Sequence, residues 1–402
     1  MSDENLVDSE ENIYPSLDTI PLEVFLHICS FLDGKELTGS LKYVCKSFYE
    51  ILTDDSTWRT WLKHRWPDFP TGNLCYKDGD IPSTSLCLHI DRAFTLWSKE
   101  ESNFSKWSND TAHISTVDAV KLIQGGRVGI SGSRDRSLSV WNTTDKLTLV
   151  QNVTGHTGWI WNLAYCTEMH QLFSCSWDTL VKQWSLAEGL TELASYKCKT
   201  AVLAAAVRPG LLAAGLFSPE VDIFDPRYGG ERVTGYRAHS RSIMALAIVR
   251  DYIVSASEDQ TLSVYDLTAG KVFKAGIHIT KEGHPLNLSY SGGNLLFIGD
   301  TMGRLHILDM NHEPFNVVNS FDLGHQSPTG VYTHKSITAM WHDPGFILTG
   351  SKDASVRVHT TTNPPRLITR LSSTHGEITA MDFADPVLLV GCANNAVEMW
   401  KP

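Results

Sequence analysis

Long hydrophobic runs are missing from this 402-residue sequence. The longest candidate, Ala201–Val207, is cut off by Arg208 and falls far short of the roughly 20 apolar residues that a membrane helix needs. The first residues, MSDENLVDSEENIY, also lack the apolar core of a secretory signal. We therefore expect an intracellular protein, cytoplasmic or nuclear, that does not act at a membrane.

Closely spaced cysteine pairs and a basic excess are also missing. The eight cysteines include no CxxC pair, and several lie in apolar segments, which indicates reduced, buried thiols. The formal net charge of −11 argues against nucleic acid as the main partner. Part of this charge lies in residues 1–16, for which we predict a disordered, solubilising tail rather than a docking segment; its acids are Asp3, Glu4, Asp8, Glu10 and Glu11.

The sequence does contain a repeat, in which two short apolar runs flank a tight polar turn, as in a β-hairpin. Its clearest copy is Leu172–Ser185, LFSCSWDTLVKQWS, with Asp178 in the turn and Trp184 in the second run. Seven copies end at positions 141, 184, 224, 265, 308, 359 and 400, so successive gaps are 43, 40, 41, 43, 51 and 41 residues. This spacing is typical of one four-stranded propeller blade.

A Gly-His or a close variant precedes several copies, and in these features the chain resembles the WD-repeat family. The resemblance implies an all-β propeller of seven blades. It also implies that the loop His, turn Asp and strand Trp of each copy form a structural hydrogen-bond network inside the blade. The residues concerned are His113, Asp135, Trp141, His156, Asp178, Trp184, His239, Asp259, His334 and Asp353.

The recurrence of this set argues against catalysis. His156, Ser176 and Asp178 have the residue types of a triad, but equivalent sets recur in several blades and would make several active sites. Blades three and five have lost the set, with Phe224 and Leu308 at the terminal position, so we expect these blades to open first.

The pattern of apolar and polar residues in 17–66 is typical of helices. A helix is predicted from Pro21 through Leu32, with its polar residues on one narrow stripe and more apolar surface than a single core requires. A second helix is expected at Leu41–Leu52 and a third after the cap Asp54-Asp55-Ser56. A module of this size would be only marginally stable on its own. We therefore expect it to complete its core against another chain or against its own propeller.

The ordered string of this module resembles the F-box, with Ile20-Pro21-Leu22-Glu23-Val24 at its start, Val44-Cys45-Lys46 in the middle and Asp54-Asp55-Ser56 before Trp58. Two positions depart from the family pattern: Gly34 replaces the usual proline and Phe48 the usual tryptophan. The resemblance implies docking onto the Skp-type adaptor of a cullin–RING ubiquitin ligase. By position, the residues that would form or support this contact are Ile20, Pro21, Leu22, Val24, Leu32, Leu37, Val44 and Cys45.

Residues 67–101 are predicted to be a connector with a bracing helix at Ser85–Glu101, the alternative being a long flexible linker. The apolar stripe of this helix would be Leu86, Ile90, Ala93 and Trp97, with Asp91 and Arg92 facing outward.

The propeller is predicted over residues 102–402. The last hairpin ends at Trp400, so blade seven needs an outer strand from elsewhere, and we expect the segment 102–107 to supply it. The surplus segment Asn319–Tyr332 is predicted to be a long loop, which would account for the 51-residue gap.

One end of the ring is the candidate surface for a protein target. Residues just before each turn Asp and just after each loop His should border it, and they include aromatic and basic side chains, the usual anchors of interfaces. Ordinary surface variation is the alternative, and the acidic Glu258 and Glu377 leave a phosphate-reading role open. The candidates are Arg134, Trp159, Trp177, Phe217, Arg241, Lys335 and Lys352.

No cofactor or metal site is expected. Cys166, His170 and Cys175 have metal-ligand residue types, but they span two strands and a turn with no second pair nearby. Gly125-Gly126 is a hairpin turn, because no GxxxxGK follows it.

A small all-α F-box module followed by an all-β seven-bladed WD-repeat propeller resembles the F-box/WD-repeat substrate receptors. The resemblance implies a non-catalytic subunit whose propeller binds a protein substrate and whose F-box binds the adaptor, with the cullin and RING subunits reached through it. Two alternatives remain: a propeller scaffold that binds the adaptor without directing ubiquitination, and an enzyme built on a propeller.

Overall fold

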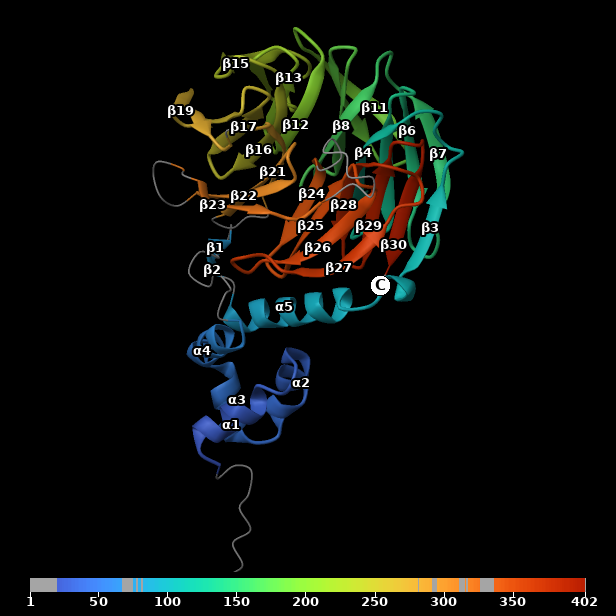
Figure 1. Cartoon of the computed structure of the whole chain (residues 1–402). Helices are drawn as coiled ribbons and strands as arrows, with labels where there is room; N and C mark the ends of the chain where they lie inside the picture. The colour runs from blue at the N-terminus through green and yellow to red at the C-terminus, as the bar shows by residue number, and fades with distance from the viewer. Residues whose placement is uncertain are drawn as a thin grey trace, which may run out of the picture.

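The computed structural model describes residues 20–66, 75–76, 79–80, 82–280, 282–290, 295–310, 315, 317–325 and 336–401. A helical base, one long crossing helix and a propeller follow one another along the chain (Figure 1). The predicted acidic tail 1–16, most of the connector before the crossing helix, His334 and Lys335 lie outside the described residues.

Seven four-stranded antiparallel sheets make the propeller, each running from an inner to an outer strand. The first three blades are β4 (Val117–Ile123), β5 (Val128–Ser133), β6 (Ser137–Asn142) and β7 (Thr148–Thr154); β8 (Ile160–Cys166), β9 (Gln171–Ser176), β10 (Leu180–Ser185) and β11 (Thr191–Lys197); and β12 (Val202–Arg208), β13 (Leu211–Leu216), β14 (Glu220–Phe224) and β15 (Arg232–Arg237).

The next three blades are β16 (Ile243–Val249), β17 (Tyr252–Ser257), β18 (Thr261–Asp266) and β19 (Lys271–His278); β20 (Pro285–Ser289), β21 (Leu295–Asp300), β22 (Arg304–Asp309) and β23 (Val317–Asp322); and β24 (Ile337–Asp343), β25 (Phe346–Ser351), β26 (Ser355–Thr360) and β27 (Leu367–Ser372). Because β23 is the outer strand of blade five, the prediction of one loop over Asn319–Tyr332 was wrong for its first residues. Two further short strands before the crossing helix, β1 (Cys75–Tyr76) and β2 (Gly79–Asp80), pair with each other.

Blade seven contains β28 (Ile378–Ala384), β29 (Val387–Cys392) and β30 (Val397–Lys401), and its outer strand is β3 (Ser105–Asn109), from before blade one. β3 begins later than the predicted segment 102–107, because Glu101–Asn103 form the 3₁₀ helix η3. Trp107 pairs with Met399 in the β3–β30 register. The amine of Lys106 adds an ion pair, 3.3 Å from a carboxylate oxygen of the fully buried Glu398. The ring is therefore closed by backbone pairing between the two ends of the propeller.

Close packing explains the glycine before the loop histidine. A Cβ atom on Gly155 would lie 2.3 Å from the ring of Trp184, which is nearly fully buried. Any other residue at position 155 would have to displace that ring, so the Gly-His pair is a packing requirement of blade two.

The helical base contains α1 (Leu22–Cys29), α2 (Gly34–Gly39), the 3₁₀ helix η2 (Leu41–Tyr43), α3 (Lys46–Thr53) and α4 (Asp55–Arg65). The prediction of a single helix over Leu41–Leu52 was wrong, because Cys45 has an extended backbone and caps α3. Helix α2 was not predicted. It starts at a capping box, in which the Asp33 side chain accepts from the Glu36 N–H and the Glu36 side chain accepts from the Asp33 N–H.

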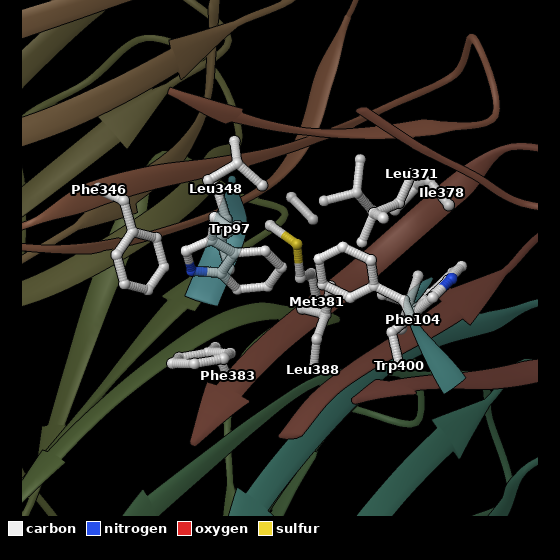
Figure 2. Close-up of a cluster of buried hydrophobic side chains, with 14 of the residues drawn as sticks. Trp97, Phe104, Phe346, Leu348, Leu371, Ile378, Met381, Phe383, Leu388 and Trp400 are labelled. Carbon is white, nitrogen blue, oxygen red and sulfur yellow. The ribbon is translucent and has the colours of Figure 1, made fainter. Parts of the chain in front are cut away.

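The crossing helix α5 (Ser83–Trp97) belongs to two cores. Its first half, including Leu86 and Ile90, packs in the core of the helical base. Its C-terminal part, including Ala93, packs against blades six and seven. Figure 2 shows Trp97 of this part among the side chains of that cluster. The Trp97 ring centroid lies 5.4–5.7 Å from those of three phenylalanines, Phe104, Phe346 and Phe383. Helix α5 thus joins the two parts of the molecule through buried side chains.

Asp91 on α5 points inward, which corrects the prediction that it faces outward. Its carboxylate lies 3.0 Å from the Arg65 guanidinium and accepts a 2.8 Å hydrogen bond from the Gly34 N–H. A proline at position 34, as in the usual F-box pattern, has no N–H to donate. The departure at Gly34 therefore provides a donor for this buried acid. Arg92 does face outward, in an exposed ion pair with Asp385.

Candidate functional site

The helical base exposes apolar side chains, mainly from α1 and the η2–α3 junction. Among the residues predicted to contact an adaptor, Leu22 is 49%, Val24 47% and Val44 61% exposed. Pro21 is also exposed, whereas Ile20, Leu32 and Cys45 are half-buried. Leu37 is fully buried and can only support such a contact from within the core.

The sequence reasoning did not single out four further exposed side chains of the base, Ile28, Phe31, Tyr43 and Tyr49. The apolar excess of the first helix was the signal for Ile28 and Phe31. We call Leu22, Val24, Ile28, Phe31, Tyr43 and Val44 the F-box face.

A stacked pair of rings holds the F-box face in place from behind. Phe25 of α1 and Phe48 of α3 are buried, with centroids 4.3 Å apart and planes 26° apart. Phe48 therefore fills the position of the usual tryptophan with a core contact. Because α1 and α3 are packed through these rings, the exposed side chains are presented by a folded unit.

The predicted His/Asp/Trp sets form hydrogen-bond networks, and blade two shows the geometry. His156 Nδ1 lies 2.8 Å from Asp178 Oδ2, and His156 Nε2 lies 2.7 Å from Ser174 Oγ. Trp184 Nε1 donates to the same Ser174 oxygen at 2.8 Å. The serine in contact with the histidine is therefore Ser174, rather than the Ser176 of the candidate triad.

Blade one repeats this geometry with His113, Ser131, Asp135 and Trp141. Burial alone would raise the pKa of Asp135, but hydrogen bonds from His113 and Ser137 hold it well below its usual range. A carboxylate fixed in this way organises the turn. The imidazole and hydroxyl are fully buried, as expected for a structural network.

Blade four keeps His239, Asp259 and Ser255, with Tyr265 at the terminal position. In blade six the histidine that contacts Asp353 is His325, with Nδ1 at 3.1 Å from the carboxylate. This corrects the assignment of that role to His334. The second Gly-His of the surplus segment, Gly324-His325, is thus the loop pair of blade six.

Blade five has a different network, although the predicted set is absent from it. His306 Nε2 lies 3.0 Å from Asp300 Oδ2, and His306 Nδ1 lies 2.7 Å from Ser320 Oγ. All of this lies inside the blade, since Asp300 and His306 are buried. Blade seven has Asn394 in its turn, and its His375 lies 2.6 Å from Glu398 instead. Among the residues described, only blade three therefore has neither the usual set nor a histidine–carboxylate pair.

The candidate target surface contains a row of aromatic rings over blades two and three. The Trp177 centroid lies 5.5 Å from Trp159, 6.0 Å from Trp161 and 5.5 Å from Phe217. Trp177 is 36% and Phe217 53% exposed. We call these four rings the aromatic ridge. Trp161 was not predicted because it lies on the inner strand β8 rather than in a loop.

Arg134 of blade one fixes one end of the aromatic ridge. Its guanidinium carbon lies 5.3 Å from the Trp159 and 5.4 Å from the Trp161 ring centroid. Asp118 holds it with two bonds, of 2.6 and 3.1 Å, and this hydrogen bonding raises the pKa of Arg134. The structure thus brings together Arg134, Trp159, Trp177 and Phe217.

The remaining candidates lie elsewhere on the same end of the ring. Arg241 is in blade four, with its guanidinium 3.5 Å from Glu258. Lys352 is exposed in blade six and lines a central cavity of about 1050 Å³, together with Arg134 and Trp161. Lys335 lies outside the described residues.

The aromatic ridge and α5 lie at opposite ends of the propeller. In blade six, the β24–β25 turn at Asp343 contacts His89 of α5, whereas the β25–β26 turn carries Lys352. Successive turns of an antiparallel sheet lie at opposite ends of its strands. A target on the aromatic ridge would therefore leave the joint with the helical base free.

Metal sites and membrane helices are both absent from the described parts of the chain. No group of three His, Cys, Asp or Glu residues there is arranged to hold a metal ion. Cys166 and Cys175 instead belong to one apolar core, and burial raises their pKa values. No described helix is long and apolar enough to cross a membrane.

Comparisons with known proteins assign the class. Residues 17–62 match the F-box-like family, and residues 147–185 and 230–266 match the WD domain, G-beta repeat. F-box/WD repeat-containing protein 9 of Bos taurus and that of Homo sapiens are each 30% identical over 397 residues, covering 96% of this chain and 83% of the relative. The chain belongs to the F-box/WD-repeat protein family.

More distant similarities agree with this class. F-box/WD repeat-containing protein mec-15 of Caenorhabditis elegans is 25% identical over 336 residues, covering 77% of this chain and 78% of the relative. The crystal structure of the WD40 β-propeller domain of Doa1 superimposes with a TM-score of 0.63 at 18% identity, covering 75% of this chain and 97% of that one. The latter similarity concerns the fold alone.

Proposed function

We propose that this chain is the substrate-recognition subunit of an SCF-type ubiquitin ligase. Its F-box face would bind a Skp-type adaptor, and the cullin and RING subunits would be reached through that adaptor. The other end of the propeller would bind the protein target. The observation that carries this proposal is the F-box face, a set of exposed apolar side chains on a folded F-box module.

Exposing the apolar side chains of the F-box face to water is unfavourable in free energy, and a partner that covers them would remove this penalty. Half-exposed leucine and valine side chains gain roughly 25 cal/mol for each Å² of apolar surface that a partner covers. The acidic side chains of α1 and α2 start these helices and are not part of the apolar set. An apolar partner surface is therefore the complement that this module lacks.

The role proposed for the chain is proximity rather than chemistry. A target bound to the propeller would be held at a high effective concentration near the conjugating enzyme carried by the other subunits. Helix α5 supports this role, because its two halves are buried in the helical base and against the propeller and so join these two parts firmly. The His, Asp and Ser side chains of the repeated sets make hydrogen bonds inside the blades, which favours a non-catalytic receptor.

We place this activity in the cytoplasm or nucleus. The seven cysteines whose side chains are described are all free thiols, and six of them are buried. Free cysteines of this kind are typical of reducing compartments.

Co-purification tests the proposal. Tagged full-length chain should recover the Skp-type adaptor, the cullin and the RING subunit, whereas a Pro21→Asp/Leu22→Asp variant should recover none of them. Tyr228→Asp, an exposed change on the propeller, is the matched control and should behave as wild type. Recovery of no adaptor by the wild-type chain would refute the proposal. Adaptor without cullin would instead support a scaffold that does not direct ubiquitination.

A further inference from the structure

The aromatic ridge gathers three exposed rings, those of Trp159, Trp177 and Phe217, and every other ring of the ridge lies against Trp177. Trp159, Trp177 and Phe217 come from different loops of blades two and three, so the ridge is assembled by the fold. Exposed aromatic clusters of this kind are unusual on a surface without a partner. Tryptophan in particular is enriched among the residues that dominate binding energies.

Three basic side chains at this end of the propeller are already paired with acids of the chain. Arg134 is bound to Asp118, Arg241 lies beside Glu258, and Lys199 lies 2.6 Å from Glu220, three residues after Phe217. A phosphate group would have to separate a guanidinium or an amine from its own carboxylate. Recognition of a phosphorylated segment through these residues is therefore disfavoured.

A cationic ligand is disfavoured as well. The Arg134 guanidinium already occupies the position over the Trp159 and Trp161 rings that a cation would take. A second positive charge beside it would be repelled. What the ridge leaves open is the apolar surface of Trp177 and Phe217, next to locally neutral polar groups.

The central cavity adds a concave end to this surface. Trp161 and Arg134 line the cavity, and so do the apolar side chains of Leu203, Leu246 and Met244. An extended segment that lies across Phe217 and Trp177 would thus reach the cavity mouth beside Trp161.

We propose that the aromatic ridge binds an extended, unphosphorylated segment of the target protein, anchored by a large apolar side chain. This inference rests on the proposed function and assigns its class of substrate. The locally neutral charge of the ridge complements an uncharged segment, and the ring surfaces complement an aliphatic or aromatic anchor.

The test uses short synthetic peptides whose central residue is Leu, Phe, Arg, Glu or phosphoserine, in otherwise random sequence. Binding to full-length chain in complex with its adaptor is measured by fluorescence polarisation. We expect the Leu and Phe sets to bind at least about tenfold more tightly than the others. Trp177→Ser and Phe217→Ser should each remove this preference, whereas Lys352→Ala, at the same end of the ring, should keep it.

Several results would overturn the inference. They are a preference for phosphoserine or Arg, a loss of binding in Lys352→Ala, or no peptide binding by the wild-type complex. Thermal melting of each variant shows whether it folds, and Phe217→Ser gives an independent reading if Trp177→Ser does not. Since adaptor binding is required to assemble the sample, failure here is distinguishable from failure of the proposed function.

Discussion

The propeller and the helical base treat apolar side chains in opposite ways. In the propeller, every described strand belongs to a four-stranded sheet, and even the edge of the last blade is paired with β3. In the base, a small core around Phe25, Phe48 and Trp58 leaves Leu22 and Val44 about half exposed. The described strand edges of the propeller are thus paired within this chain, whereas the base leaves apolar side chains uncovered, as the proposed adaptor contact requires.

The largest expected effect comes from opening the ring. Trp107→Pro/Ser108→Pro removes two adjacent N–H groups from β3, so at least one bond to β30 is lost, and proline disrupts the strand itself. We expect the free energy of unfolding to fall by about 3 kcal/mol or more. Trp107→Val/Ser108→Thr keeps the backbone donors and is the control.

Chemical denaturation of both double variants measures this difference. Equal stabilities would mean that the β3–β30 pairing does not close the propeller. The adaptor affinity of the proline variant should be unchanged as long as the protein is folded.

A smaller loss is expected from one blade network. Ser174→Ala removes the hydroxyl that lies between His156 and Trp184. The buried ring nitrogens of both residues then lose this hydrogen-bond partner. The expected cost is about 2–4 kcal/mol. Blade three, with Ala214 at the equivalent strand position, manages without this network.

Ser176→Ala is the matched control for this prediction, because the Ser176 hydroxyl accepts only the Asp178 N–H among the hydrogen bonds described. Its destabilisation should be clearly smaller. Hydrogen exchange should also show that blade three opens before blade two; the reverse order would contradict the role given to the networks.

The smallest effect is expected at the joint between the two regions. A hydrogen bond with Asp343 of blade six raises the pKa of His89 on α5 above its ordinary value of 6.5. This contact should therefore stabilise the protein fully below pH 6.5, and the contribution should be lost as the pH rises through the raised pKa. Because the pair is partly exposed, its contribution should stay below about 1 kcal/mol.

The propeller itself should respond to pH with the opposite sign. Burial lowers the pKa of His342, on β24, to about 3, so its contribution is present above pH 6.5 and is lost as the pH falls towards 3. Thermal unfolding of wild type and His89→Ala across this range separates the two effects. The difference between the two proteins should be largest at low pH; a difference that grows as the pH rises would contradict the account.

The fold could be predicted from the sequence because the repeat is periodic, even though the turn and terminal residues vary between copies. Blade six was the exception, since Gly324-His325 and His334 both have the expected residue type, and the contact of His325 with Asp353 is not visible in the sequence. The inward position of Asp91 was missed because an apolar stripe describes a helix with one partner, whereas α5 has two.

The candidate surfaces could be predicted from the sequence only in part. The loop positions led to Trp159, Trp177 and Phe217, but Trp161 reaches them from an inner strand, which a loop-based rule does not examine. In the F-box, the family pattern does not separate buried Leu37 from exposed Val44. That distinction depends on how short helices pack, and it decides which side chains a partner can touch.

The affinity of the purified chain for a purified Skp-type adaptor tests the central claim most directly. Leu22→Asp and Val44→Asp should each weaken binding by at least about tenfold, while the melting temperature stays within a few degrees of wild type. Val150→Asp, at an exposed apolar residue of the propeller strand β7, should leave the affinity unchanged. Wild-type affinity in both F-box variants would show that the exposed apolar side chains of the base are not its interface.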